Sequence, residues 1–520
     1  MPQAIILDAC AEPERAGRVS PEKPDDLMTA AAQANTTRQP SRDERAFRVA
    51  VRTDIPARLD RLPWCRVHVL IVVALGVTWI LDGLEVTIVG AIGPVLQDPK
   101  TLALSAQQIG AAATSYVVGA VCGALIFGWL TDRSGRRFVF YVTLIVYLTG
   151  VLLSATSWSF WSFAAFRAIT GLGIGGEYAA INSAIDELIP ANYRGRVDLM
   201  VNGSFWLGAV AGSGASLVFL DPAVMPVDLG WRFGFAIGGV LGLGILLLRG
   251  FVPESPRWLV THGWKGQADA AMDDIEQRVR ADTGVDLSST RDYLEVYARK
   301  SFGLGLILSA MLRKYRERSL LALALLTAQA FLFNAVFFSY GLVLTTFHGV
   351  SEHSTGLYLL PLAASNFFGP VLLAPLFDTV GRRKMIVFTY TTAGLLLLAT
   401  AILLGFDVFS AWTQTMAWMV IFFFASAAAS SAYLTVSEIF PLEARALAIA
   451  VFYALGTAIG GATGPLLFGY LIVSGALAAV AGGYAVAAVL MLVAAGAELR
   501  FGIDAERRPL ESIAEPLSTA

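Results

Sequence analysis

The chain has 520 residues, of which 56% are hydrophobic and 15% are charged, and its mean hydropathy is +0.63. This composition excludes a soluble protein of the same length and indicates an integral membrane protein. The formal net charge of −2 offers no electrostatic basis for nucleic-acid binding.

Residues 1–65 are polar and mixed in charge. They lack the apolar core of a signal peptide, so we expect a mostly disordered cytoplasmic tail. Residues 501–520 have a similar composition and are expected to form a second cytoplasmic tail. The cysteines Cys10, Cys65 and Cys122 form no disulfide pattern.

Twelve apolar segments lie between these tails, each close to the ~20 residues that a helix needs to cross the hydrocarbon core. They are 69–92, 108–130, 138–156, 159–183, 198–220, 232–250, 320–346, 355–377, 385–404, 414–436, 444–472 and 477–497. The sequence therefore predicts an all-α membrane protein of twelve transmembrane helices in two six-helix repeats. The predicted parts are an N-terminal bundle at 66–250, a cytoplasmic linker at 251–318 and a C-terminal bundle at 319–500.

Basic residues gather in the loops on one side of the predicted bundle, whereas the loops on the other side hold only Lys100 and Arg232. Cytoplasmic loops are enriched in Lys and Arg, so we expect both termini in the cytoplasm. The excess of arginine over lysine is typical of GC-rich bacterial genes and favours a multi-pass protein of the bacterial inner membrane.

Two unrelated patterns occur twice, in the same order. Asp132-Arg-Ser-Gly-Arg-Arg137 returns as Asp378-Thr-Val-Gly-Arg-Arg383, 246 residues later. Glu187-x-x-Pro-x-x-x-Arg194 returns as Glu438-x-x-Pro-x-x-x-Arg445, 251 residues later. The chain is therefore a duplicated half-molecule, the design from which secondary transporters build a central site between two moving bodies.

Each copy of the first pattern also has a local physical interpretation. Gly135 and Gly381 permit sharp chain reversals between helix ends. The carboxylates of Asp132 and Asp378 can lie against the positive N-terminal end of a helix or pair with arginines. Such ion pairs would form when the cytoplasmic side is closed and separate when it opens.

Three ionisable residues inside the predicted membrane segments have no copy in the second half. The position matching Arg167 lies near Met416, and the counterpart of Asp82 and Glu85, around residues 330–335, contains no acid. Charges inside a bilayer are unfavourable and usually functional. Glu85 and Arg167 both lie ~10–12 Å below the same membrane boundary, so they are expected to pair. Asp82 shares a helix face with Glu85 and lies deeper.

The segment Gly128-Trp-Leu-Thr-Asp132-Arg-Ser-Gly-Arg-Arg137 resembles the signature between helices two and three of the major facilitator superfamily. Three more segments resemble its sugar-porter and metabolite:proton-symporter branch. They are Arg167-x-x-x-Gly-x-Gly-x-Gly-Gly-Glu177, Pro253-Glu-Ser-Pro-Arg257-Trp258 and Ser437-Glu-Ile-Phe-Pro441. The resemblance covers about residues 66–500 and implies a twelve-helix fold with alternating access, commonly driven by the proton gradient.

The resemblance also implies a role for the charged residues at the cytoplasmic ends of the helices. It implies that these residues form a latch at the inner gate. They are Asp132, Arg133, Arg136, Glu187, Arg194, Glu254, Arg257, Asp378, Arg382, Glu438 and Arg445. The alternative is that these charges only anchor the topology.

Proton-coupled relatives have an acid in helix one after Gly-x, and Gly83-Leu84-Glu85 is similar. This resemblance implies proton coupling through Asp82, Glu85 and Arg167. Protonation of Glu85 would release Arg167 and shift the preferred state of the bundle. The alternatives are a static buried ion pair and recognition of an anionic substrate by Arg167.

Helices seven and ten differ from the sugar-porter pattern. The amides of Gln329 and Asn334 are kept, but Phe331 and Leu332 replace small polar residues, and Tyr433 stands where tryptophan is expected. Sugar hydroxyls need many hydrogen-bonding partners, whereas aromatic walls suit an amphipathic or aromatic solute. The candidate substrate-binding residues are Gln329, Asn334, Tyr433, Asn202, Trp206 and Asn366. For each, helix packing is the alternative.

The sequence thus predicts a proton-coupled symporter that imports a small organic or aromatic acid. A sugar transporter and a drug or cation:proton antiporter remain alternatives. An enzyme is not expected because no nucleophile–base pair or metal-ligand spacing occurs, and we expect no cofactor and no metal. The expected partners are a small-molecule substrate, protons and the lipid bilayer, and the chain is expected to function as a monomer.

Overall fold

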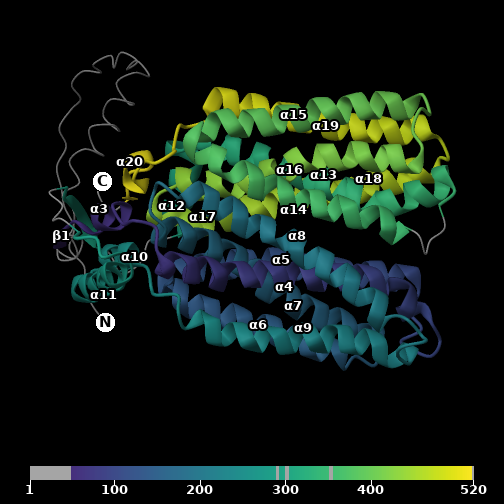
Figure 1. Cartoon of the computed structure of the whole chain (residues 1–520), viewed down its shortest axis with the longest axis horizontal. Coiled ribbons are helices and arrows are strands. Elements are labelled where there is room, and N and C mark those ends of the chain that lie inside the picture. The colour runs from purple at the N-terminus through teal and green to yellow at the C-terminus, as the bar shows by residue number, and fades with distance from the viewer. Residues whose placement is uncertain (1–48, 288–291, 299–303, 351–354, 518–520) are drawn as a thin grey trace, which may run out of the picture. The chain divides into compact units, whose positions relative to one another are not determined.

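The computed structural model describes residues 49–287, 292–298, 304–350 and 355–517. Long helices lying side by side make up most of it (Figure 1). The first half contains α4 (Arg66–Gln97), α5 (Ala106–Ser134), α6 (Arg136–Ala155), α7 (Phe160–Leu188), α8 (Arg194–Phe219) and α9 (Val227–Arg249).

The second half repeats this arrangement. It contains α13 (Arg316–His348), α14 (Thr355–Thr379), α15 (Arg382–Gly405), α16 (Ala411–Ile439), a continuous run of α17 (Arg445–Gly456), η4 (Thr457–Gly461) and α18 (Ala462–Val473), and α19 (Leu477–Phe501). Each predicted transmembrane segment coincides with one of these helices to within several residues. The prediction of twelve helices in two halves is confirmed.

Among the described residues, ten helices are long and apolar enough to cross a membrane by length and composition alone. The other two of the twelve are α7 and α8, which have 29 and 26 residues and carry four and three charged side chains, respectively. α7 packs against α5 and α6, and α8 packs against α4 and α14. All of these charged side chains are buried within the protein except that of Arg196, which is partly exposed.

The halves meet along two equivalent helix pairs. α5 of the first half packs against α17 of the second, and α8 of the first half packs against α14. Because these helices come from corresponding positions in the repeat, the interface is approximately symmetric. The space between the halves lies along these helices.

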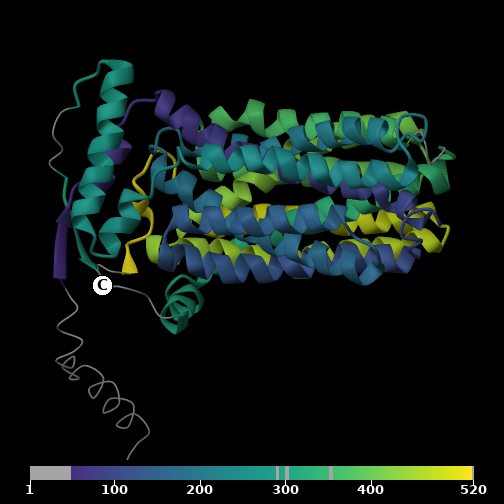
Figure 2. The ribbon, with the colours of Figure 1, turned by 90° about the horizontal axis from the view of Figure 1, so that it is seen from below.

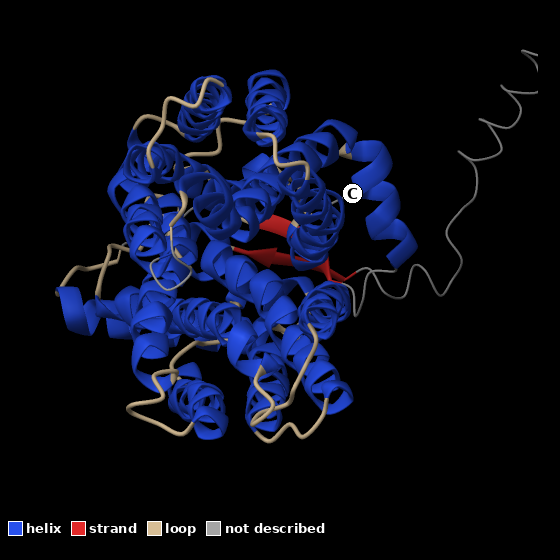
Figure 3. Ribbon diagram, turned by 90° about the vertical axis from the view of Figure 1, so that its right-hand side faces the viewer, coloured by secondary structure: helices blue, strands red, loops and turns tan. Residues whose placement is uncertain are grey.

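Small elements gather at one end of the bundle, which we call the linker end, and lie across the ends of the long helices (Figure 2). They are α3 (Ile55–Asp60), α10 (Pro256–Thr261), α11 (Lys265–Thr283), α12 (Leu304–Ser309), η1 (Ala310–Lys314), η3 (Leu442–Ala444) and α20 (Leu510–Ile513). Two strands complete this layer, β1 (Val49–Thr53) and β2 (Leu294–Ala298), which pair antiparallel with Val51 opposite Val296 (Figure 3). The opposite end is called the far end.

The prediction of a disordered tail up to residue 65 is wrong for residues 49–65. Ile55 and Leu59, one helical turn apart, pack in an apolar cluster with Trp258 and Met272 of the linker. These two apolar residues thus order an otherwise polar segment, because the linker supplies the apolar side chains against which they pack. Residues 1–48 lie outside the described part of the chain.

The prediction of a disordered C-terminal tail fails in the same way. α20 is helical, and Leu510 and Leu517 are buried. Residues 518–520 lie outside the described part.

Candidate functional site

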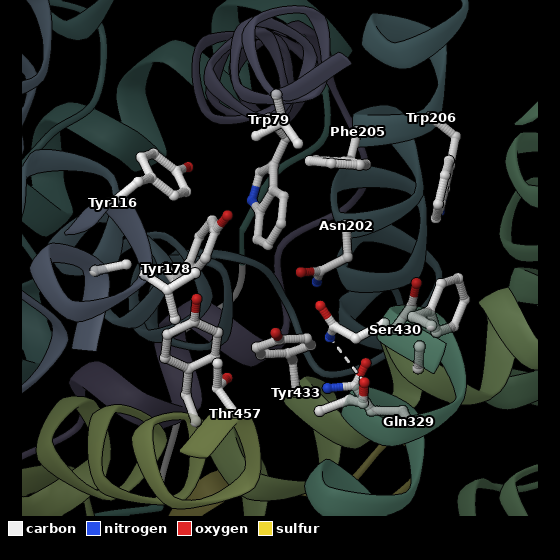
Figure 4. A pocket seen from close by; sticks show the side chains of 18 of the residues that line it. Trp79, Tyr116, Tyr178, Asn202, Phe205, Trp206, Gln329, Ser430, Tyr433 and Thr457 are labelled. Atoms are coloured by element: carbon white, nitrogen blue, oxygen red, sulfur yellow. Dashed lines mark hydrogen bonds between the residues drawn. The ribbon is translucent and has the colours of Figure 1, made fainter. Parts of the chain in front are cut away.

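A cavity of about 350 Å³ lies between the two halves, lined by side chains from α4, α5, α7 and α8 on one side and from α13, α16, α17 and η4 on the other (Figure 4). Five of the six predicted substrate residues line it: Asn202, Trp206, Gln329, Asn334 and Tyr433. Asn366 does not. It is buried, and its amide donates to the carbonyl of Leu362 one turn earlier in α14, so the prediction for Asn366 is wrong in placement.

Aromatic rings form much of the cavity wall. Trp79 and Tyr178 stack with their centroids 4.6 Å apart (Figure 4). Tyr453 meets Tyr178 edge-on at 5.2 Å. These three residues were not predicted from the sequence. Trp79 lies one turn before Asp82, so the helical spacing to the predicted acid could have indicated it.

A second aromatic cluster joins the halves. Trp206 of α8 lies 4.9 Å from Phe337 and 5.6 Å from Phe333 of α13, measured between ring centroids. Trp206 and Phe333 also line a second cavity of about 350 Å³ that includes Ser213. Ser213 lies further along α8 from the linker end, so the hollow space continues towards the far end.

Several buried polar atoms around the central cavity have no hydrogen-bond partner among the described residues. They are Trp79 Nε1, Asn202 Oδ1 and Ser426 Oγ. Buried polar groups are normally paired. The cavity therefore offers one unused donor, one unused acceptor and one hydroxyl group to a ligand.

Arg167 is the one charged side chain among the described residues that line the cavity. Its guanidinium donates to Glu85, and it lies over the Tyr116 ring at 4.4 Å from the centroid. Both charged side chains are only 2% exposed. The ion pair expected from the sequence is present.

Asp82 is fully buried beside this pair but does not contact Arg167. It accepts hydrogen bonds from the hydroxyls of Tyr116, at 3.1 Å, and Tyr178. Both tyrosines line the cavity, so they separate the Asp82 carboxylate from the space that a ligand would occupy. The two acids of α4 thus have different partners, a cation for Glu85 and two neutral donors for Asp82.

At the linker end, the first copy of the repeated motif connects the halves. Asp132 of α5 accepts backbone N–H groups from Ala446 and Leu447, at 3.3 and 3.0 Å, at the start of α17. Arg136 pairs with Asp132 at 3.3 Å and with Glu187 at 2.6 Å. A carboxylate at a helix N-terminus is stabilised by the helix dipole and by charge-assisted hydrogen bonds.

The second copy makes the reciprocal contact. Asp378 of α14 accepts the N–H groups of Gly195 and Arg196, at 3.2 and 2.9 Å, at the start of α8. Arg382 pairs with Asp378 at 2.7 Å and with Glu438 at 3.0 Å. Each half therefore caps a helix of the other.

Arg194 and Arg445 lie between these two clusters. Arg194 of the first half is 3.7 Å from Glu438 of the second, and Arg445 of the second is 3.5 Å from Glu187 of the first. Asp186, which was not predicted, lies within 3.9 Å of Arg194 and 3.8 Å of Arg445. Eight of the eleven residues named for the latch, together with Asp186, thus form a buried network that joins the two halves at this end.

Glu254 caps the start of α6. Its carboxylate accepts the N–H groups of Arg136, at 2.9 Å, and Arg137, at 3.1 Å, beside Gly135, whose φ is 91°. Burial raises the pKa of the Glu254 carboxyl, although these backbone donors act against the increase. The sharp reversal predicted at Gly135 is confirmed.

Glu506 plays the same part at α15, where it accepts the N–H of Arg382 at 3.3 Å beside Gly381, whose φ is 121°. It lies 252 residues after Glu254, close to the other repeat offsets. The offset could have located it, but the surrounding residues differ from Pro-Glu-Ser-Pro.

The remaining two predicted latch residues differ from each other. Arg257 is buried and pairs with Asp60 and with Glu511, each at 3.0 Å. Burial lowers the pKa of Arg257, but the two carboxylates outweigh it and the net shift is upwards. Arg133 is exposed and lies over the Trp129 ring at 5.1 Å, and it forms no ion pair within the described residues.

A family model described as "Sugar (and other) transporter" matches residues 71–517. The fold is similar to that of the proton:xylose symporter XylE, with a TM-score of 0.70 and 19% identity over 85% of this chain and 98% of that chain. A partially occluded inward open structure of XylE from E. coli gives a TM-score of 0.58.

Related transporters are named after several different kinds of substrate. A niacin transporter of Acinetobacter baylyi is 30% identical over 43% of this chain and 49% of the relative. Myo-inositol transporter 1A of Cryptococcus neoformans is 27% identical over 72% of this chain and 67% of the relative. Organic cation/carnitine transporter 7 of Arabidopsis thaliana is 33% identical over 38% of each chain. The match spans about half the length of the niacin transporter and of a putative metabolite transport protein of Bacillus subtilis.

Proposed function

This chain belongs to the sugar (and other) transporter family, in the sugar-porter branch of the major facilitator superfamily, and we propose that it is a proton-coupled importer of a small organic acid. It is a multi-pass membrane protein built as a transporter. The proposal concerns its substrate, its coupling ion and the direction of transport.

The observation on which the substrate class depends is the charge of the cavity lining. Arg167 is cationic, and no carboxylate lines the cavity within the described part of the chain. Aromatic rings surround the remaining space, and unpartnered atoms of Trp79 and Asn202 can orient a polar group. An aromatic or otherwise planar carboxylate fits these features, because it can pair with the guanidinium while its ring packs between the side chains.

The Glu85–Arg167 pair supports the proposed coupling to protons. When Glu85 is ionised it holds the guanidinium, and a substrate carboxylate must compete for it. Protonation of Glu85 removes this competitor and frees the donors of Arg167. Proton and anionic substrate would then bind together, as symport requires.

The linker-end network supports alternating access. In the present state Asp132 and Asp378 join the halves at the linker end, whereas the cavities extend towards the far end. Opening must break both contacts. The lower similarity to the inward open XylE structure supports assignment of the linker end as the inner, cytoplasmic side. Both termini would then be cytoplasmic, and we place the protein in a bacterial inner membrane, active as a monomer.

The relatives named above support the proposed substrate and the proposed coupling ion to different degrees. Niacin is an aromatic acid, so the similarity to the niacin transporter supports the proposed substrate class. The XylE neighbour supports proton symport. The myo-inositol relative favours a sugar or polyol transporter as the second candidate. An organic cation is disfavoured because the acids Asp82 and Glu85 lie behind Tyr116, Tyr178 and Arg167.

A thermal-shift screen of the purified protein tests the substrate class. The probes are nicotinate, 4-hydroxybenzoate, succinate, xylose, myo-inositol and tetraethylammonium, at mildly acidic and at neutral pH. A ligand that binds the folded state raises the melting temperature. We expect stabilisation by a carboxylate, larger at acidic pH, and uptake of that compound into proteoliposomes driven by an inward proton gradient. Stabilisation by a sugar or polyol alone, independent of pH, would replace the acid by the second candidate.

A further inference from the structure

The first half contains a second ion pair that is buried among the long helices and that the transport site does not use. Glu177 of α7 and Arg249 of α9 are 3.0 Å apart, and both side chains are 0% exposed. Thr78 of α4 accepts a hydrogen bond from the same Arg249 nitrogen at 2.8 Å, and Thr143 of α6 lies 3.4 Å from Glu177. Four helices therefore meet at this pair.

The pair is incompletely satisfied. Two of the three guanidinium nitrogens of Arg249, Nε and Nη1, have no hydrogen-bond partner among the described residues. Removing two charges from water is unfavourable unless the remaining donors and acceptors are also paired. The guanidinium also lies over the Phe140 ring, 4.4 Å from its centroid, but this cation–π contact supplies no hydrogen-bond acceptor of the usual kind for the two donors. A pair kept only to hold helices together would be expected to use these donors.

The pair also breaks the repeat, as Asp82, Glu85 and Arg167 do. The offsets of the duplicated motifs, 246 and 251, place the counterpart of Glu177 within residues 423–428, which contain no acid. They place the counterpart of Arg249 within residues 495–500, where the arginine is the exposed Arg500. The symmetric scaffold of the second half is built without such a pair. Its presence in the first half alone associates it with the asymmetric part of the cycle.

The position of the pair connects the acid site to the linker end. Thr78 lies one turn before Asp82 on α4, and Tyr178, next to Glu177, donates its hydroxyl to Asp82. On the other side, Arg249 is the last residue of α9, five residues before Glu254, which caps α6 at Arg136. Arg136 in turn pairs with Asp132, which holds α17 of the other half.

We propose that Glu177 is a second proton-binding carboxylate of the transport cycle, and that its protonation releases Arg249 and weakens closure of the linker end. In the proposed step the carboxylate of Asp82 first takes up a proton from the cavity side. The resulting carboxylic acid then gives this proton to the carboxylate of Glu177, so that Asp82 is again a carboxylate and Glu177 is neutral. Arg249 then loses its counter-ion. This inference depends on the proposed function, because it extends the same proton pathway.

The charged and polar groups around Glu177 come from each helix packed against it. α9 contributes Arg249, α4 contributes Asp82 and Thr78, and α6 contributes Thr143. α5 contributes Phe127, which packs against Gly176. Arg249 is thus the cation paired with Glu177, and Tyr178, the next residue along α7, donates to the acid Asp82.

The test measures closure of the linker end without a substrate. Spin labels are placed on Phe138→Cys of α6 and Lys384→Cys of α15, both exposed near the linker end of opposite halves. Cys10 and Cys122 are replaced by serine, and buried Cys65 is retained. Pulsed electron–electron double resonance then gives the distribution of distances between the two spin labels from acidic to neutral pH.

Glu177→Gln mimics the protonated acid. We expect it to raise the ratio of long to short distances at neutral pH about fivefold or more, the size typical of allosteric coupling, and to reduce its pH dependence. Glu177→Asp should keep the response to pH, and Thr149→Val, which removes an exposed hydroxyl of α6 that does not contact Glu177, should match the wild type. If Glu177→Gln does not fold, Arg249→Lys, which retains the charge but lengthens the ion pair, should give the same change in smaller degree.

Identical distance distributions for Glu177→Gln and the wild type, in a wild type that responds to pH, would overturn this inference and leave the proposed function in place. A wild type without any response to pH, together with no proton-driven uptake, would overturn both.

Discussion

Asp132 of α5 and Asp378 of α14 occupy equivalent positions in the two halves, and each accepts two backbone N–H groups at the start of a helix in the opposite half. The arrangement is reciprocal, since α5 holds α17 and α14 holds α8. Neither half can tilt away at the linker end without breaking charge-assisted hydrogen bonds to the other. The duplicated motif therefore acts in trans, between the halves, as well as within its own loop.

We predict that Asp132→Asn and Asp378→Asn each open the linker end more often. An amide oxygen accepts these hydrogen bonds without the negative charge, and the loss of about 1.4 kcal/mol corresponds to a tenfold shift in population. Hydrogen exchange should become about tenfold faster in the first turns of both α8 and α17 in either variant. Faster exchange only in the helix that contacts the mutated residue would mean that the two aspartates are independent local caps.

The Glu85–Arg167 pair gives a prediction about coupling. Glu85→Gln removes the titratable group while keeping the shape of the side chain, so the variant should lose accumulation driven by a proton gradient and keep counterflow exchange. The measurement is uptake into proteoliposomes of the carboxylate identified by thermal shift, with and without the gradient. Asp221→Asn, an exposed acid beyond α8, is the matched control. Full accumulation by Glu85→Gln would remove Glu85 from the coupling mechanism.

The sequence predicted the fold and most of the linker-end network because both depend on patterns along the chain. Twelve apolar segments define twelve helices, and a motif repeated at a nearly constant offset identifies Asp378 and Arg382 from Asp132 and Arg136. Glu85 and Arg167 were paired correctly because depth in the membrane can be estimated from residue counts.

The features that were missed depend on helix rotation and on contacts between distant segments. Tyr178 turns towards Asp82 and Asn366 turns away from the cavity, and a count of residues along one helix cannot distinguish these orientations. Arg249 could be taken for a topology anchor at the end of α9, but it is buried against Glu177. The order in residues 49–65 depends on partners in the linker more than 190 residues away.

The charge of Arg167 predicts which ligands the cavity distinguishes. Nicotinate and nicotinamide share a ring and differ in charge, so the wild type should bind the acid more tightly. Arg167→Gln should lower the affinity for the acid about tenfold or more, because a hydrogen-bonded charge pair is worth about 1.5–3 kcal/mol, and should leave the affinity for the amide nearly unchanged. Isothermal calorimetry on both variants gives the comparison. Equal losses for the acid and the amide would show that Arg167 shapes the cavity without recognising the anion.

The N-terminal segment should detach from the linker in a pH-dependent manner. Arg58 and Arg61 of α3 and the following turn pair with Glu276 of α11, at 2.9 and 2.5 Å. Burial alone would raise the pKa of Glu276, but hydrogen bonds from the two arginines outweigh it, so the net shift is downwards. A depressed carboxyl pKa contributes stability that is present above the unfolded value, about 4.3, and is lost as the pH falls through the folded value.

Glu276→Gln should therefore increase hydrogen exchange in residues 55–61 at neutral pH. Glu276 is buried, but the side chains of Arg58 and Arg61 are 14% and 20% exposed to solvent, so we expect a loss of about 1 kcal/mol or less, or up to about fivefold in the exchange rate. The difference between variant and wild type should disappear at pH below the folded pKa of Glu276, where the wild-type carboxyl is also neutral. Asp274→Asn, which removes only the exposed partner of Arg278 within α11, is the control and should leave residues 55–61 unchanged. A difference that persists at low pH would mean that packing of Ile55 and Leu59, rather than the ion pairs, fixes this segment.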